Sequence, residues 1–290
     1  MERGLQSTSA TDQASRLRQW VHSREKTALT LAVTSGKGGV GKSNVAVNLS
    51  ICLAARKLRV TLVDVDMGLA NVDLLMNLQP RYTISHVMSG LRTLEEVMIE
   101  GPAGLRVIPG ANGVRECADI SDFERQNLVH QIQRLETNAD IVVLDCGAGI
   151  SRNVLTFAVS ANQVLVVTTP QPTALADAYA TIKTLHRERY NGKVSVFVNM
   201  ARSKSEATAA YTRLTKVAER FLKFPVAYLG YMLHDTAVEL AVRQRSPFVV
   251  RYPGSNASAC ITAVSAELAR LCVVRENRGG WFKRVVGLFA

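Results

Sequence analysis

Short runs of apolar, β-branched residues alternate with longer stretches of helical periodicity from residue 29 onward. The apolar runs are nearly continuous, which is typical of strands that are covered by helices on both faces of a sheet. The pattern predicts strands at 29–34, 59–65, 105–108, 140–145, 163–169, 194–199 and 226–230. It predicts helices at 42–56, 121–138, 173–190, 205–222, 235–244 and 256–274. Because strand and helix alternate in this way, we expect an α/β fold: a doubly wound, mostly parallel sheet with helices on both faces.

Both ends of the chain depart from this alternation. Residues 1–28 form a polar extension, in which the spacing of apolar positions predicts one short amphipathic helix over 11–23. At the other end, the polar and Gly-rich stretch 275–280 leads into the ten residues WFKRVVGLFA. The chain therefore divides into an extension at 1–28, a core domain at 29–274, and a linker with a C-terminal amphipathic helix at 275–290.

The C-terminal helix has a broad apolar face. At 100° per residue, Trp281, Phe282, Val285, Val286, Leu288 and Phe289 fill an arc of roughly 160°, and Lys283 and Arg284 lie opposite. Aromatic residues beside cations are typical of a helix that lies in the plane of an anionic membrane surface. One copy is expected to bind weakly and two linked copies better, because the second insertion is intramolecular. The alternative is a helix that packs on its own domain.

The composition is that of a foldable globular protein, with 47% hydrophobic and 20% charged residues among 290. No apolar run approaches the roughly 18–20 residues of a membrane span, and the N-terminal region lacks the apolar segment of a secretory signal. Five cysteines without a C-x-x-C pair argue against a disulfide framework. We therefore expect a cytoplasmic protein. The net charge of +11 favours anionic partners without choosing among nucleotides, nucleic acid and an acidic membrane surface.

Residues 36–43 read GKGGVGKS and match the phosphate-loop pattern G-x-x-x-x-G-K-[ST]. A predicted strand precedes the motif and a predicted helix follows it, which is the frame that the motif requires. The backbone N–H groups of Gly36, Lys37, Gly38, Gly39, Val40 and Gly41, with the helix N-terminus, are expected to form a positive concavity for phosphate. The glycines let the backbone approach the phosphate oxygens closely.

The side chains that follow the loop supply the remaining groups of a nucleotide site. Lys42 offers a point charge to the β- and γ-phosphates, and Ser43 offers a hydroxyl to Mg²⁺. Asn44 is the next candidate for nucleotide binding. Asp145 follows four apolar residues at the end of the predicted strand 140–145, which is the Walker B arrangement, and we expect it to hold Mg²⁺ through water. The small residues 147–149 would let this segment reposition with the γ-phosphate.

Two further carboxylates follow the predicted strand 59–65. Asp64 and Asp66 are two positions apart, so they are expected to share a strand face. One carboxylate could orient or deprotonate the water that attacks the γ-phosphate, and the other could lie near the metal ion. The residues alone do not assign the two roles.

Lys37, within K-G-G-V-G-K-S, resembles the second lysine of the deviant Walker A loop of the MinD/ParA class of ATPases. The resemblance implies ATP and Mg²⁺ as cofactors, slow hydrolysis, and an ATP-bound homodimer in which Lys37 reaches the partner's nucleotide. It implies that Asp66 activates the water. It also implies that Asn199, at the end of the run VSVFVN, reads the adenine together with the loop Gly230–Asp235.

Two segments are similar to a narrower family. DVDMGLANVDLLMNL at 64–78 resembles the D-A-D-x-G-L-A-N-x-D stretch of the FlhG/FleN family, MinD-like regulators of flagellar number. The N-terminal DQASRLR matches the D-Q-A-x-x-L-R motif of that family at every fixed position, namely Asp12, Gln13, Ala14, Leu17 and Arg18. The resemblance implies that this helix stimulates FlhF, a flagellar GTPase of the signal-recognition-particle type, and that the ATP dimer binds the inner face of the cell membrane. It leaves open whether flagellar switch proteins or a flagellar transcription regulator are also partners.

Other classes of protein share the loop. A DNA- or cargo-partitioning ATPase of the ParA type would use the positive charge, but no helix-turn-helix pattern precedes the loop, so DNA is not an expected partner. A division-site ATPase of the MinD type is a further alternative. An iron–sulfur carrier would need cysteines paired at a dimer axis, and Cys117 and Cys146 offer no suitable pair.

Overall fold

The computed structural model describes residues 28–66, 70–110, 135 and 138–273. Within these ranges eight strands form one sheet in the order β3-β4-β2-β5-β1-β6-β7-β8. Only β3 runs antiparallel to its neighbour, so the prediction of a mostly parallel sheet is confirmed. The strands are β1 (Leu29–Ser35), β2 (Val60–Asp64), β3 (Ile99–Glu100), β4 (Arg106–Ile108), β5 (Ile141–Ala148), β6 (Gln163–Thr168), β7 (Lys193–Ala201) and β8 (Ala227–Leu233).

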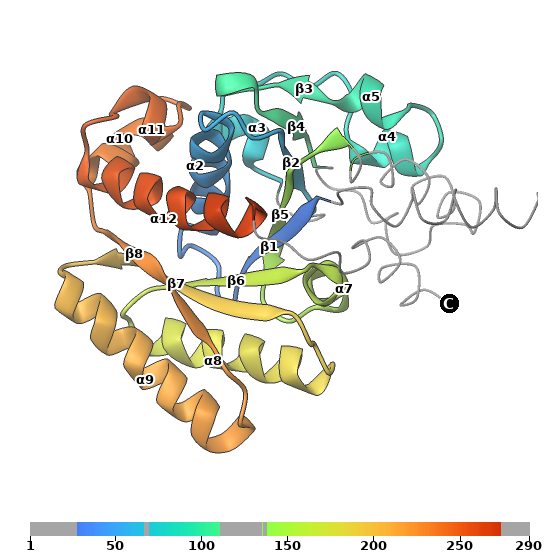
Figure 1. Ribbon diagram of the computed structural model, residues 1–290. Helices are drawn as coiled ribbons and strands as arrows, with labels where there is room; N and C mark the ends of the chain where they lie inside the picture. Colours follow the sequence, from blue (N-terminus) through green and yellow to red (C-terminus); the bar gives the residue numbers. More distant parts are fainter. Residues whose placement is uncertain (1–27, 67–69, 111–134, 136–137, 274–290) are drawn as a thin grey trace, which may run out of the picture.

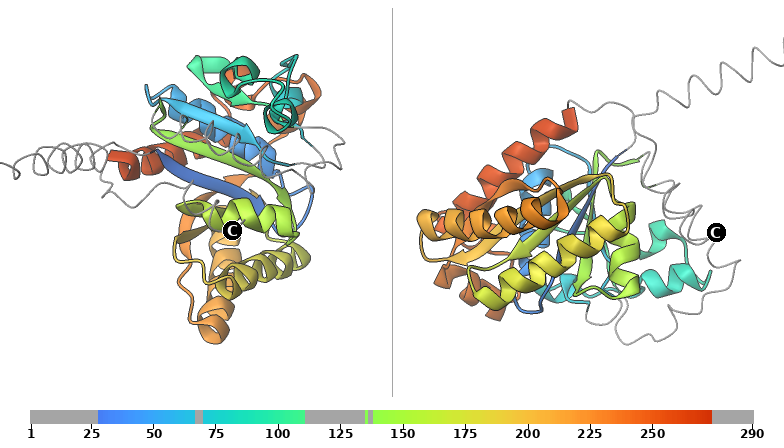
Figure 2. Two further views of the ribbon diagram at one scale, coloured as in Figure 1. Left: turned by 90° about the vertical axis from the view of Figure 1, so that its right-hand side faces the viewer. Right: turned by 90° about the horizontal axis from the view of Figure 1, so that it is seen from below.

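Helices cover both faces of this sheet (Figure 1). They are α2 (Lys42–Ala54), α3 (Val72–Leu75), α4 (Ile84–Met88), α5 (Leu94–Val97), α7 (Arg152–Ser160), α8 (Pro172–Arg187), α9 (Lys204–Leu222), α10 (Thr236–Arg243), α11 (Phe248–Arg251) and α12 (Asn256–Val273), with a 3₁₀ turn at Pro102–Gly104. The views of Figure 2 show α7, α8 and α9 on one side of the sheet and α2 and α12 on the other. Each layer encloses its own hydrophobic core.

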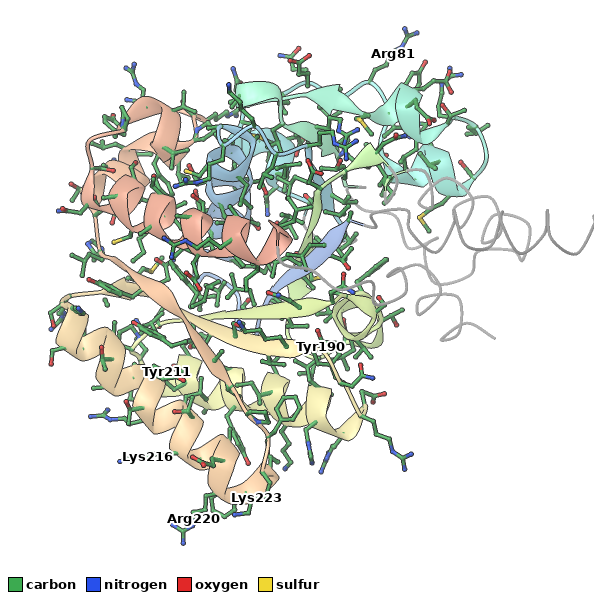
Figure 3. The ribbon with its side chains drawn as sticks, in the orientation of Figure 1. Arg81, Tyr190, Tyr211, Lys216, Arg220 and Lys223 are labelled. Atoms are coloured by element: carbon green, nitrogen blue, oxygen red, sulfur yellow. The ribbon has the colours of Figure 1, made fainter. Side chains whose placement is uncertain are left out.

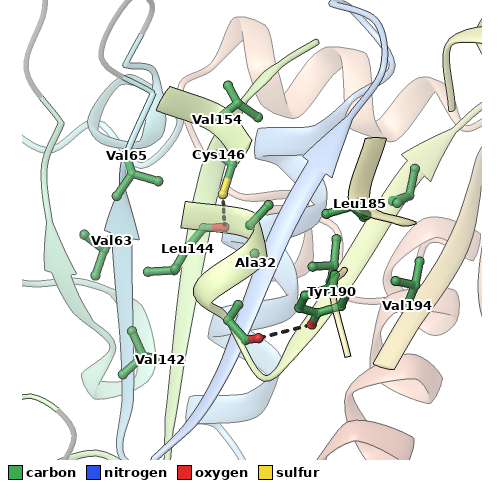
Figure 4. Close-up of a cluster of buried hydrophobic side chains, with 14 of the residues drawn as sticks. Ala32, Val63, Val65, Val142, Leu144, Cys146, Val154, Leu185, Tyr190 and Val194 are labelled. Carbon is green, nitrogen blue, oxygen red and sulfur yellow. Dashed lines mark hydrogen bonds between the residues drawn. The ribbon is translucent and has the colours of Figure 1, made fainter. Parts of the chain in front are cut away.

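The alternation of side chains along a strand decides which core each residue enters. Ile141 and Val143 of β5 belong to the core under α2 and α12, so Asp145, two residues further, points to the same side. Leu62 of β2 belongs to that core as well, which places Asp64 on the α2 side. The intervening residues Val142 and Leu144 of β5 enter the opposite core, against α7 and α8, which also contains Tyr190 (Figure 4).

Several boundaries differ from those that the sequence predicts. β5 does not end at Asp145 but continues to Ala148, because its last residue pairs with Ser35 of β1. Residues 147 and 148 therefore belong to a strand rather than to a free segment. β2 ends at Asp64, so Asp66 lies beyond the strand and does not share a strand face with Asp64.

Five short helices and one strand were not predicted. α7 contains several β-branched residues, but it packs Val154 and Ala158 into the core against β5 and β1, and this packing overrides its weak helical propensity. The elements α3, α4, α5, α11 and β3 are only two to five residues long, too short for a periodic signal. The predicted helix 121–138 lies almost entirely outside the described residues.

Candidate functional site

The loop of residues 36–41 joins β1 to α2 and is held tightly at its two ends. A Cβ atom on Gly36 would collide with the main chain of α8 at Asp177. Gly41 has a φ of 83°, and a Cβ there would collide with the side-chain amide of Asn199. A Cβ built on Gly38 or Gly39 would meet nothing within 4 Å among the described residues. The tip of the loop is therefore open, and its backbone can approach an anion closely.

A buried ion pair lies directly under this loop. Lys42, the first residue of α2, is 7% exposed, and its Nζ donates to Asp145 Oδ1 at 2.7 Å. Burial alone would lower the pKa of Lys42, but the attraction of Asp145 outweighs it and the pKa lies above its ordinary value. Burial raises the pKa of Asp145, and the neighbouring Lys42 and Ser43 oppose that rise. The cation of the loop and the carboxylate of β5 thus meet at one point.

One oxygen of the Asp145 carboxylate in this ion pair has no hydrogen-bond partner among the described residues. Asp145 is 1% exposed, and its Oδ2 is buried without a hydrogen-bond partner among the described residues. Lys42 Nζ also donates to Ser43 Oγ at 3.2 Å, so the serine hydroxyl lies beside this carboxylate. Magnesium ions prefer a few hard oxygen ligands completed by water and phosphate oxygens. Ser43 and Asp145 therefore have the chemistry and the placement that fit Mg²⁺.

Asp64 lies beside Asp145 but has different partners. The two residues are register partners on β2 and β5. Asp64 is fully buried, and its carboxylate accepts hydrogen bonds from the backbone N–H groups of Asp66, Asn71 and Val72. Burial and the repulsion of Asp145 raise the pKa of Asp64 to about 7, and the backbone donors and Lys42 oppose that rise.

Asp66 lies past the end of β2, against β5. A Cβ built on Gly147 would lie 3.3 Å from Asp66 Oδ1, so the two segments are in close contact. The charge of Asp66 also acts on both Lys42 and Asp145. The structure therefore brings Asp66 to the same cluster as the ion pair.

Lys37 differs from Lys42 in being exposed. Its Nζ lies 3.4 Å from Thr173 Oγ1 at the start of α8, and its carbonyl accepts a hydrogen bond from Ser35 Oγ. An exposed cation on a loop can reach an anion that a second molecule brings. Asn44 lies in the first turn of α2, where its carbonyl accepts a hydrogen bond from the Asn48 side chain.

The residues expected around the adenine are engaged in protein contacts. Asn199 does not end its strand, since β7 continues to Ala201. Its Nδ2 donates to the Val40 carbonyl at 2.8 Å, and its Oδ1 accepts from Met200 N at 2.8 Å. The expected loop at 230–235 is mostly strand, because β8 extends to Leu233. Asp235 caps α10 and also accepts from the N–H of Ala257 on α12.

Some predicted elements lie outside the described residues. These are the motif residues Asp12, Gln13, Ala14, Leu17 and Arg18, the cysteine Cys117, and the C-terminal helix with Trp281, Phe282, Lys283, Arg284, Val285, Val286, Leu288 and Phe289. Across the part of the chain that the structure describes, no helix is both long enough and apolar enough to cross a membrane.

Sequence reasoning missed one residue of this site, Thr173, which contacts Lys37. The available signal for Thr173 was Pro172, which marks a helix start directly after the carboxyl end of β6 and hence at the same sheet edge as the loop. Gly147 was singled out only as part of the small-residue run 147–149. Its close approach to Asp66 could not be predicted, because it depends on where the residues after β2 lie.

The comparisons with known proteins agree with this geometry. Residues 28–196 match the model of a family described as an AAA domain. The antiactivator FleN of Pseudomonas aeruginosa is 39% identical over 249 residues, which cover 86% of this chain and 89% of FleN. The flagellum site-determining protein YlxH of Helicobacter pylori is 32% identical, over 88% of this chain and 89% of YlxH.

A solved structure shares the fold. The septum site-determining protein MinD of Pyrococcus horikoshii, complexed with Mg-ADP, superimposes with a TM-score of 0.70 at 22% identity. The match covers 87% of this chain and all of that one. At this identity the likeness speaks for the fold alone.

Proposed function

Because this chain belongs to the AAA-domain family and, within it, to the MinD-like ATPases that include FleN, we propose that it is an ATP-driven switch that controls flagellar number and placement. The printed names of FleN and YlxH support the flagellar assignment. The name antiactivator also supports a transcription activator as a further partner.

One observation carries the nucleotide chemistry: the buried pair of Lys42 and Asp145 lies under an open glycine loop, and Asp145 Oδ2 has no partner among the described residues. We assign the triphosphate of ATP to the loop 36–43, where Lys42 would exchange its bond to Asp145 for the β- and γ-phosphates. Ser43 would hold Mg²⁺, with Asp145 acting through water. When bound, Mg²⁺ neutralises the negative charge that the phosphate oxygens carry.

Asp66 is the residue that we assign to the attacking water. It lies at the cluster of Lys42 and Asp145, and a carboxylate there can orient a water and accept its proton. Lys37 is assigned to the nucleotide of a second copy of the chain, because it is exposed at the loop tip while Lys42 is buried. Each triphosphate would then gain a second cation only when two subunits meet, so that ATP drives dimerisation.

The two ends of the chain would bind a partner GTPase and the membrane during this cycle. The DQASRLR segment at 12–18 is assigned to stimulation of the flagellar GTPase FlhF, and the segment 281–290 to the inner membrane surface. A dimer presents two membrane-binding segments and holds the membrane better than a monomer, since the second insertion is intramolecular. Hydrolysis would return monomers and release the protein.

ATP hydrolysis by the purified full chain tests the site. Lys42→Ala should abolish both hydrolysis and nucleotide-driven dimerisation, because the phosphates lose their buried cation. Lys216→Ala is the matched control: this lysine is exposed and lies on the outer side of α9 (Figure 3). Equal activity of Lys42→Ala and wild type would refute the assignment of the loop.

GTP hydrolysis by the FlhF of the same genome, with a peptide of residues 1–26 added, tests the flagellar role. Stimulation that disappears on replacement of Gln13 and Leu17 by Ala would support it. The absence of stimulation would favour the alternatives, a division-site or DNA-partitioning ATPase.

Liposome flotation with ATP and with ADP tests the membrane role. Binding to anionic vesicles should be stronger with ATP and should be lost on removal of residues 281–290. Equal binding in the two nucleotide states would contradict a switch that the dimer controls.

A further inference from the structure

We propose that Asp64 is a positioning residue, whose buried carboxylate holds the backbone at Asp66 and at the start of α3 and thereby places Asp66 at the phosphate site. The inference rests on the hydrolysis site proposed above. It assigns to Asp64 a role different from contact with water or metal, the two roles that its sequence position suggests.

Among the described residues, the Asp64 carboxylate accepts hydrogen bonds from the backbone just after β2 and from the start of α3. Its Oδ1 accepts a hydrogen bond from Asp66 N at 3.0 Å, and its Oδ2 accepts from Asn71 N at 3.0 Å and from Val72 N at 3.2 Å. Hydrogen bonds to a carboxylate are stronger than those between neutral groups when the acceptor is ionised. One side chain thus holds the backbone at Asp66 and the backbone at the start of α3.

Asp64 is closely packed by the residues that the structure describes. Asp64 is 0% exposed. A Cβ built on Gly110 would lie 2.9 Å from Asp64 Cγ and 2.7 Å from the Cβ of Ala70. The backbone just after β4 therefore packs directly on the carboxyl group of Asp64. The carboxyl group is thus enclosed by its own backbone donors and by this packing, and it acts on the reaction through the atoms it holds and through its charge.

The two carboxylates at the ends of β2 and β5 therefore have separate partners. Asp64 and Asp145 are register partners and point to the same side of the sheet. Lys42 Nζ lies 2.7 Å from Asp145 Oδ1, and Asp145 Oδ2 has no hydrogen-bond partner in the part of the chain that the structure describes. Asp145 thus pairs with the cation of the loop, and Asp64 holds the backbone at Asp66, Asn71 and Val72.

The backbone at Asp66 is tied to this anchor directly. Val65 N still donates to Asp145 O of β5, at 3.0 Å. One residue later, the N–H of Asp66 goes to the Asp64 side chain instead. The start of α3 is tied in the same way, because Asp64 Oδ2 accepts from the backbone N–H groups of Asn71 and Val72.

Asp64→Asn in the full chain tests the proposal, because asparagine keeps the size but replaces one accepting oxygen with a donor. We expect the affinity for a fluorescent ATP analogue to stay within about threefold of wild type and kcat to fall at least about tenfold. The amide protons of Asp66, Asn71 and Val72 should exchange faster with solvent. Asp73→Asn, which removes a carboxylate from α3 without touching the site, is the matched control and should leave kcat unchanged.

The double variant with Asp66→Ala separates positioning from a direct role. If Asp64 acts through Asp66, kcat of the double variant should equal that of Asp66→Ala alone. A further drop in the double variant, an unchanged kcat in Asp64→Asn, or a parallel loss of affinity and kcat with unchanged amide exchange would each overturn the proposal.

Wild-type amide exchange keeps the proposal testable if Asp64→Asn does not fold. In the wild-type chain the amides of Asp66, Asn71 and Val72 must then be protected, and exchange at the rate of an unstructured peptide would overturn the anchor. A wild-type chain that shows these protected amides but hydrolyses no ATP would instead refute the proposed function and leave the anchor standing.

Discussion

Replacement of Lys42 by Met should make stability strongly dependent on pH. In the wild type, Lys42 and Asp145 are 7% and 1% exposed, and their charged atoms lie 2.7 Å apart. Methionine fills much the same volume but leaves the carboxylate of Asp145 buried without its cation. Breaking a buried pair in this way costs about 3–5 kcal/mol as long as the remaining group stays charged.

The carboxyl group of Asp145 can escape this cost by binding a proton. Burial already raises its pKa, and removal of Lys42 takes away the largest opposing influence, so the pKa rises further. The folded state then binds more protons than the unfolded state, in which the pKa is near 3.8, and stability falls as pH rises. Protonation costs about 1.4 kcal/mol for each pH unit above 3.8, so at about pH 5 the loss is limited to about 2 kcal/mol.

Urea unfolding followed by circular dichroism, at about pH 5 and about pH 8, measures both values. We expect a loss of about 1–2 kcal/mol at the lower pH and about 3–5 kcal/mol at the higher one, with most of it restored in Lys42→Met/Asp145→Asn. Arg59→Met is the matched control, because Arg59 pairs with Asp140 at 3.1 Å but is 54% exposed, and it should lose about 1 kcal/mol or less. A Lys42→Met variant that loses no more than this control, or whose loss does not grow with pH, would refute the reasoning.

Three further predictions concern stability. Gly36→Ala should lose about 1–3 kcal/mol in urea unfolding, because its Cβ collides with the main chain at Asp177; Gly38→Ala, with nothing within 4 Å, should change by about 0.5 kcal/mol or less, and equal losses would contradict the packing argument. Burial raises the pKa of Asp64 from 3.8 in the unfolded chain to about 7 in the folded chain, so the folded state binds the proton more tightly. As the pH rises from about 4 to about 7, the free energy of unfolding of the wild type should therefore fall by up to about 4 kcal/mol through this group alone. Asp64→Asn should flatten that slope, and an unchanged slope would argue against it. Asp235→Ala should lose about 1–2 kcal/mol because two backbone donors lose their acceptor, and Asp235→Asn should lose less.

The layer structure of the fold could be predicted from the sequence because nearly continuous apolar runs have one common explanation, a sheet buried on both faces. The residues at which the strands end could not be predicted from the sequence. β5 continues past Asp145 because Ala148 finds a partner in Ser35 and Gly149 N donates to Ser35 O at 2.8 Å. Such pairings depend on what lies beside a strand and leave no pattern within it.

The phosphate loop could be placed from its motif because the spacing of glycine, lysine and serine is itself the structure of the site. The roles of Asp64 and Asp66 could not be assigned in the same way. They differ because β2 ends at Asp64, which turns one carboxylate onto the backbone of the next segment and leaves the other at the ion pair. Asn199 and Asp235 show the same limit, since their contacts with Val40 and Ala257 join segments far apart in the sequence.

The nucleotide-dependent mass of the Asp66→Ala variant tests the central claim most directly. In light scattering with ATP and Mg²⁺, the wild type should form a dimer that decays to a monomer as ATP is hydrolysed. Asp66→Ala should bind ATP, form the dimer and remain in it, with hydrolysis reduced by at least about tenfold. Unchanged hydrolysis in Asp66→Ala, or a wild type that stays monomeric with ATP bound, would contradict the account.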